Sequence, residues 1–234
     1  MSKKVCSTFV CLLFFLCLFA QESELEFSQN YTITDGLAHN GTTSILEDSR
    51  GYIWVGTFEG LNRYDGYEFK TFKNTLSQDL FISNRIRSLK EDTKGNIWIG
   101  TDEGISLYNY DLEEFSDIYS NQLAKKGIKG PVVRDISINK DQGIILCATE
   151  KYGILIFNDD YTLKDEYSPT AFYENGAVKF YSSLSIDKST YLYATSVGLL
   201  SFSLKDHQFT KVVSNEINNC ESLLRINAST FLAT

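Results

Sequence analysis

Short alternations of apolar and polar residues follow one another along most of the chain, and each ends at a turn-forming residue. An alternation of period two places every second side chain on the same face of a strand. In the first group it predicts four short strands, at 43–46, 52–57, 61–64 and 67–72. Asp65-Gly66, between the last two, is a strong hairpin signal because Gly accepts a positive φ. The pattern therefore predicts antiparallel sheet.

This four-strand pattern repeats along the chain. Residues 44–65 read SILEDSRGYIWVGTFEGLNRYD and residues 88–109 read SLKEDTKGNIWIGTDEGISLYN, so each landmark moves by 44 positions (88 minus 44). A small residue followed by Thr marks five units, at Gly56-Thr57, Gly100-Thr101, Ala148-Thr149, Ala194-Thr195 and Ala233-Thr234. A large apolar residue stands three positions before each threonine, namely Trp54, Trp98, Leu146, Leu192 and Phe231.

Two further landmarks recur with these. A glycine with an aliphatic neighbour follows the Thr in four units, at Gly60, Gly104, Gly153 and Gly198. A Ser and an Asp four residues apart come before it, as Ser44/Asp48, Ser88/Asp92, Ser137/Asp141 and Ser183/Asp187. Because an Asp side chain bonds readily to nearby backbone, we expect these aspartates to build the turn after the first strand.

A four-stranded unit of this length, repeated, is typical of a β-propeller blade. A β-helix needs a shorter period, and a sandwich does not repeat so regularly. The small residue before Thr suits a place where neighbouring sheets approach closely, and the large residue suits a plug between them. We therefore expect an all-β chain that forms an incomplete β-propeller of about four and a half four-stranded antiparallel blades. The blades are expected at 42–73, 85–120, 132–167, 180–213 and, truncated, 221–234, after a lead-in strand within 21–41.

The first twenty residues have the layout of a signal peptide. Lys3 and Lys4 are followed by the apolar run 5–20 and then by polar residues, and we expect cleavage after Ala20. A lipoprotein site at Cys17 and an uncleaved anchor are the alternatives, although 5–20 is short for a hydrocarbon layer of about 30 Å. Of the cysteines beyond this segment, Cys147 and Cys220, we expect two separately buried thiols rather than a disulfide.

The charge balance and the residues available for chemistry exclude several functions. Beyond the segment 1–20 there are 20 basic residues (22 minus Lys3 and Lys4) and 30 acidic ones, which disfavours nucleic acid as a partner. His39 and His207 lie near aspartates but lack a positioned nucleophile, so we interpret them as solvated loop residues. We find no catalytic, metal-binding or cofactor-binding motif and expect no membrane span after the signal. Ligand contacts are expected from loops at one end of the blades, without a choice among them.

The motif D-x-x-G-x-[IL]-W-[VI]-G-T-x-x-G-[LI]-x-x-Y-[DN], at 48–65 and 92–109, resembles the two-component regulator propeller repeat. The opening 31–37 (YTITDGL) also resembles the start of those sensors, and the likeness covers roughly 27–234. The resemblance implies the exported, periplasmic sensor region of a hybrid two-component histidine kinase, with many members responding to glycan breakdown products. Trp54, Gly56, Thr57, Gly60, Trp98, Gly100, Thr101 and Gly104 are then structural residues of the repeat.

The resemblance also bears on what the chain lacks. Thr234 falls midway through a fifth unit, so we expect an N-terminal fragment whose partners are further blades of the same protein and an oligosaccharide. Without the kinase domain that the family carries, the chain is expected not to be an enzyme. Two alternatives stay open: an exported propeller enzyme, such as a lyase or glycoside hydrolase, and a protein-binding propeller scaffold.

Overall fold

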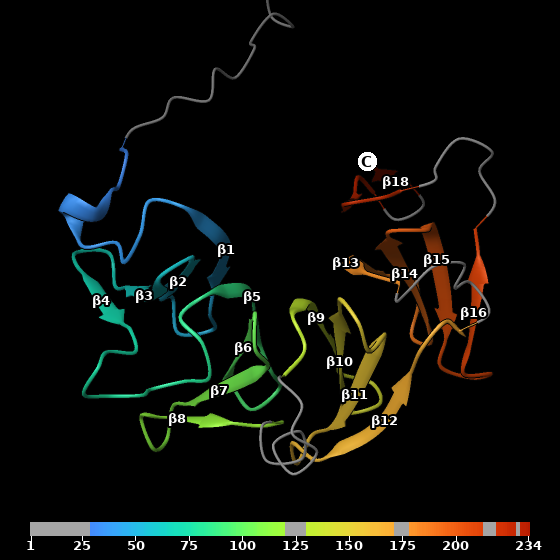
Figure 1. Ribbon diagram of the computed structural model, residues 1–234, viewed down its shortest axis with the longest axis horizontal. Helices are drawn as coiled ribbons and strands as arrows, with labels where there is room; N and C mark the ends of the chain where they lie inside the picture. The colour runs from blue at the N-terminus through green and yellow to red at the C-terminus, as the bar shows by residue number, and fades with distance from the viewer. Residues whose placement is uncertain (1–28, 120–129, 171–177, 213–218, 228–229) are drawn as a thin grey trace, which may run out of the picture. The chain divides into compact units, whose positions relative to one another are not determined.

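The computed structural model describes residues 29–119, 130–170, 178–212, 219–227 and 230–234. The signal peptide predicted in 1–20 therefore lies outside the described residues. Thr32–Thr234 forms a compact unit distinct from Met1–Tyr31. The described part of this unit is built from β-strands and one short 3₁₀ helix (Figure 1). It contains no helix that is long and apolar enough to cross a membrane.

The strands of the described residues include four antiparallel sheets of four strands each, and each of these sheets comes from one repeat unit. Within each sheet the strands lie side by side in chain order. The first sheet holds β1 (Thr42–Glu47), β2 (Ile53–Thr57), β3 (Gly60–Tyr64) and β4 (Phe69–Phe72), and the second holds β5 (Ile86–Glu91), β6 (Ile97–Thr101), β7 (Ile105–Asn109) and β8 (Glu114–Asp117). The third holds β9 (Val133–Asn139), β10 (Ile144–Thr149), β11 (Ile154–Asn158) and β12 (Leu163–Tyr167), and the fourth holds β13 (Phe180–Ser185), β14 (Thr190–Thr195), β15 (Gly198–Ser203) and β16 (Gln208–Lys211).

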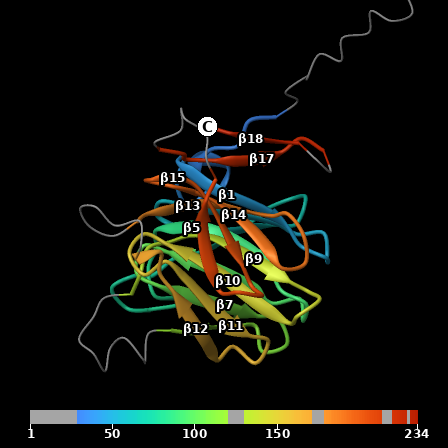
Figure 2. The ribbon, with the colours of Figure 1, turned by 90° about the vertical axis from the view of Figure 1, so that its right-hand side faces the viewer.

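A two-stranded sheet, β17 (Leu223–Arg225) and β18 (Phe231–Ala233), follows the four larger ones (Figure 2). The first strands of successive sheets pack against each other in order: β1 on β5, β5 on β9, β9 on β13, and β13 on β17. An all-β chain of four-stranded antiparallel sheets that pack in series is the architecture of propeller blades, so the predicted fold class is confirmed.

The apolar core is divided among the seams between sheets. Trp54 and Leu61 of the first sheet pack with Ile86 and Tyr108 of the second. Corresponding clusters lie between the second and third sheets, the third and fourth, and the fourth and the final hairpin. The middle sheets are therefore covered on both faces, and β6 is buried at every one of its residues. A strand buried on both faces needs a nearly continuous apolar run, which explains the IWIGT sequence of β6.

The structure differs from two sequence-based expectations in its described residues. The described part of the expected lead-in strand, 29–41, contains no strand; Ile33–Asp35 forms a 3₁₀ helix that begins with a capping box between Thr32 and Asp35. The Ser/Asp landmark also shifts out of register in the later units, although Asp187 still accepts the backbone N–H groups of its turn, as expected. In the first sheet, Ser44 pairs with Gly56. Ala148 and Ala194 occupy the position of Gly56 in the third and fourth sheets, and they pair with Asp135 and Ser182 rather than with Ser137 and Ser183.

Candidate functional site

The repeated Thr closes the turn after the second strand of each sheet. Its hydroxyl donates to the carbonyl of the following Gly, over 2.8 Å for Thr57 to Gly60 and 3.0 Å for Thr101 to Gly104. Both glycines have a positive φ, 142° and 141°, which a side chain rarely tolerates. Thr149 and Thr195 make the same bond in the later sheets. The Thr and the Gly are therefore fixed by the geometry of the turn.

Gly56 and Gly100 lie at close approaches between neighbouring sheets. A Cβ on Gly56 would lie 2.7 Å from Ile86 of the next sheet, and one on Gly100 would lie 2.9 Å from Val133. In both places it would also collide with a Ser hydroxyl on its own sheet. These glycines therefore serve the packing between sheets.

Trp54 is held at the first seam by a carboxylate and by a tyrosine from the second sheet. Its indole N–H donates to Asp48 Oδ2 over 2.7 Å, and the Tyr110 hydroxyl donates to the same oxygen. The other oxygen of Asp48 accepts the backbone N–H groups of Arg50 and Tyr52. Burial alone would raise the pKa of Asp48, but these four hydrogen bonds outweigh burial and lower it. Asp48 therefore builds its turn, as predicted, and also joins two sheets.

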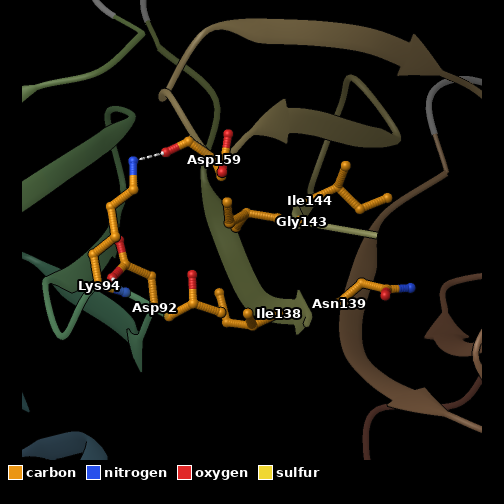
Figure 3. Close-up of a pocket in the computed structure, with 9 residues that line it drawn as sticks. Asp92, Lys94, Ile138, Asn139, Gly143, Ile144 and Asp159 are labelled. Atoms are coloured by element: carbon orange, nitrogen blue, oxygen red, sulfur yellow. Dashed lines mark hydrogen bonds between the residues drawn. The ribbon is translucent and has the colours of Figure 1, made fainter. Parts of the chain in front are cut away.

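The second seam repeats this arrangement with different residues. Asp92 Oδ2 accepts the indole N–H of Trp98 over 3.1 Å, and the Tyr161 ring packs edge-on against Trp98. Lys94 lies over Tyr161 and donates to the backbone carbonyl of Asp159, across a crevice between the sheets (Figure 3). Because these polar groups bond to one another, we interpret this end of the seam as a packing contact between the sheets rather than as a binding site.

Asp and Trp disappear together from the later units. By strand pairing, Asn139 and Ile186 occupy the position of Asp48, while Leu146 and Leu192 occupy that of Trp54. Leucine has no N–H group, so no carboxylate is needed beside it. The repeated residues thus explain the packing of the sheets, and a functional site should be sought where the repeat varies.

One position where the repeat varies keeps the same backbone geometry in all four units. The first strand of each sheet contains a β-bulge near its start, where one residue has no partner on the second strand. We call these four residues the bulge row: Thr43, Arg87, Arg134 and Tyr181. Bulges redirect a side chain and are common beside functional sites. Backbone geometry is therefore kept along the row while the side-chain chemistry changes.

A carboxylate from the neighbouring turn holds each arginine of the bulge row. Arg87 binds Asp102 through Nε and through Nη2, the latter over 2.9 Å. Arg134 donates through Nε to Glu150 Oε1 over 2.6 Å, and its Nη2 donates to the same oxygen. Arg85, two positions before the bulge, places Nε 3.2 Å from Asp102. Hydrogen bonding to Asp102 raises the pKa of Arg87, so its charge is permanent.

Phe58 adds an apolar surface beside these arginines. Its ring centroid lies 5.4 Å from Arg85 Cζ and 5.6 Å from Arg87 Cζ, and its side chain is 36% exposed. His39 packs edge-on against the same ring, while its Nδ1 accepts the N–H of Gly41. His39 is thus half-buried rather than solvated, and the interpretation of it as a solvated loop residue is wrong.

The sequence pattern alone does not reveal the bulge row. Thr43 and Arg87 stand directly before the repeated Ser44 and Ser88, so an alignment of the first two units shows this position as one whose residue changes. In the third unit, aligning on Ser137 hides Arg134, because the structure places Asp135 at the position of Ser44.

Of the other candidates, His207 is exposed and packs on Tyr167. Cys147 and Cys220 are separate, buried thiols, which confirms that prediction.

The fold and this site define an all-β propeller with a polar cluster at one end of its blades. Residues 36–59 and 81–103 match the family model of the two-component regulator propeller. A histidine kinase, P4, of Formosa agariphila is 39% identical over 68 residues, which cover 29% of this chain and 5% of that protein.

Solved structures share the fold. The extracellular domain of the hybrid two-component system BT3049 from B. thetaiotaomicron has a TM-score of 0.72 at 20% identity, covering 88% of this chain and 29% of that one. The extracellular domain of BT4673 from the same organism gives 0.71 at 19% identity, covering 88% and 30%. A streptogramin B lyase gives 0.59 at 11% identity, covering 78% and 58%. The chain spans under a third of each of these two extracellular domains.

Proposed function

We propose that this chain is part of the periplasmic, ligand-binding propeller region of a two-component sensor. Three observations support the proposal: the two matched propeller repeats, the likeness to a histidine kinase, and the signal-like segment 1–20. In this role the chain binds a ligand and carries out no chemistry. Phosphotransfer belongs to a histidine kinase domain, and further blades of the same protein complete the propeller.

The ligand in this proposal is an oligosaccharide, and the bulge end of the sheets binds it. The observation that carries the proposal is that fixed arginines and the exposed ring of Phe58 gather where the repeat changes its side chains. An aromatic face can stack on a sugar ring, and held polar groups can orient its hydroxyls. Tyr181 supplies a second ring on the bulge row.

The test is isothermal titration calorimetry of the full chain against a panel of neutral and acidic oligosaccharides. We expect at least one member to bind and Phe58→Ala to weaken that binding about fivefold or more. Tyr67→Ala is the matched control, since Tyr67 is 94% exposed in a turn and has no place in the proposed site. A folded chain that binds no member of the panel would contradict the proposal.

Chromatography of the same mixtures separates sensing from the enzyme alternative. We expect the bound oligosaccharide to be recovered unchanged after prolonged incubation with the chain. Shortened or unsaturated products would instead favour an exported propeller lyase or hydrolase.

A further inference from the structure

Two neighbouring positions of the bulge row present guanidinium groups that are already held in place. Arg87 and Arg134 stand at equivalent bulges on β5 and β9, two strands that pack against each other. We infer that these two arginines bind an oxyanion, a carboxylate or sulfate group, carried by the ligand. This inference rests on the proposed function and adds the charge that the ligand must bear.

Each arginine keeps donors to spare. A guanidinium has five N–H groups in a planar fork. The bonds to Asp102 and Glu150 use Nε and Nη2, so the Nη1 edge of Arg87 and of Arg134 has no partner among the described residues. Guanidinium edges of this kind match the two oxygens of a carboxylate or sulfate.

The charge balance of the cluster favours an anion. In the part of the chain that the structure describes, Arg85, Arg87 and Arg134 form ion pairs with two carboxylates, Asp102 and Glu150, so three positive charges meet two negative ones. Because the whole chain carries a net charge of −8, a local positive excess needs a specific explanation.

The arginines are also pre-organised for binding. The side chain of Arg87 is 17% exposed and that of Arg134 is 31% exposed, and each is fixed by its carboxylate. An anion would therefore meet donors whose side-chain entropy is largely lost already, which strengthens binding. Partial burial also lowers the screening that weakens charge contacts in water.

A purely structural explanation makes a different prediction. If the ion pairs only brace the first strands, removing one partner should destabilise the chain and leave anion affinity unaffected. If the arginines bind an oxyanion, removing the negative charge of a carboxylate while keeping its hydrogen-bond acceptor should tighten binding, because the competing charge is lost and the arginine stays in place. Asp102→Asn separates the two cases because Asn keeps an acceptor for Arg87 but loses the negative charge.

The experiment is calorimetry of the full chain with three probes: digalacturonate for a carboxylate, glucose 6-sulfate for a sulfate, and cellobiose as a neutral sugar. We expect one anionic probe to bind, and Arg87→Gln and Arg134→Gln each to weaken it about tenfold or more. Asp102→Asn should tighten binding of that probe, and added salt should weaken it. Arg63→Gln is the matched control, since the Arg63 guanidinium stacks on Tyr52.

The outcomes separate this inference from the proposed function. Binding of cellobiose but of neither anion would overturn the oxyanion site and leave saccharide sensing intact. Equal affinity of wild type, Arg87→Gln and Arg134→Gln for an anion would overturn it as well. If these variants do not fold, Arg87→Lys takes their place, because lysine keeps the charge without the planar fork. Unchanged affinity and salt dependence in Asp102→Asn would also contradict the inference.

Discussion

At the scale of single residues, the aspartate of the repeat motif has two functions carried by its two oxygens. In Asp48, Oδ1 accepts backbone N–H groups of its own turn, and Oδ2 accepts the Trp54 indole and the Tyr110 hydroxyl. The first function keeps the turn closed, and the second joins one sheet to the next. Substitutions can separate the two functions, because an asparagine replaces only one oxygen.

Asp48→Asn should lower the free energy of unfolding by about 1–3 kcal/mol, because an amide nitrogen would face the buried Trp54 N–H. Urea unfolding followed by tryptophan fluorescence measures the change. Asp187→Asn is the control: Asp187 also accepts turn N–H groups but is exposed, so its substitution should have little effect. Equal losses in the two variants would show that only the turn matters.

A second carboxylate, that of Asp135, makes the stability of the fold depend on pH. Asp135 accepts the N–H and hydroxyl of Ser183 over 2.6 and 2.8 Å, yet burial raises its pKa from 3.8. The unfolded chain therefore loses this proton first, and the stability contributed by Asp135 is full below pH 3.8 and declines as pH rises through the raised pKa.

Asp135→Asn should therefore be more stable than wild type at pH 7, with a difference that shrinks as the pH approaches 4. Urea titrations at several pH values measure this difference in the free energy of unfolding. Parallel pH profiles for the two proteins would contradict the assignment. Asp141→Asn, on an exposed turn of the same sheet, serves as the control.

At the scale of elements, the second strand of each sheet sets the distance to the next sheet. A Cβ on Gly100 would lie 2.2 Å from Ser88 Oγ and 3.0 Å from the Val133 carbonyl. The first contact involves a side chain that can be removed, whereas the second involves the backbone of β9. Ala148 occupies the same position on β10, which shows that local spacing rather than the fold as such demands glycine.

Gly100→Ala should lower the free energy of unfolding by about 1–3 kcal/mol, since overpacking forces backbone shifts. Adding Ser88→Ala should recover part of that loss by removing the nearer obstacle. Ala148→Gly, the reverse change in the third sheet, should cost about 1 kcal/mol or less. A Gly100→Ala protein as stable as wild type would mean that the sheets can move apart freely.

At the scale of the whole molecule, stability is distributed over a series of seams. Each described sheet packs mainly on its neighbours in chain order, as in repeat proteins. The two ends of the series expose apolar side chains, with Ile45 of β1 70% exposed and Leu224 of β17 62% exposed. The final hairpin has two strands and packs on β13, so it should open more easily than the four-stranded sheets.

Thiol labelling tests this gradient. Cys147 lies in the seam between the second and third sheets, and Cys220 lies beside the final hairpin; both are fully buried. Iodoacetamide under native conditions should modify Cys220 well before Cys147, and mass spectrometry of the peptides gives the two rates. Full labelling of both thiols in urea without reductant is the control for free cysteines. Equal native rates would indicate global unfolding rather than local opening.

The sequence by itself determined the fold class and the repeat. Alternating strands, turn glycines and the Trp-x-Gly-Thr spacing recur at fixed intervals, and local pairing alone turns them into four-stranded sheets. Thr57 and Gly60 could be read because the bond between them spans three residues. The family resemblance was readable for the same reason.

Only the tertiary structure decided the register of the later units, the partners across the seams and the candidate site. Tyr110 reaches Asp48 from 62 positions away, and Tyr161 reaches Trp98 from 63 positions (161 minus 98), through turns that are not equivalent in sequence. The bulge row appears only when pairing shows which residue lacks a partner. Such positions depend on the packing of neighbouring sheets, and side-chain periodicity along one strand does not contain that information.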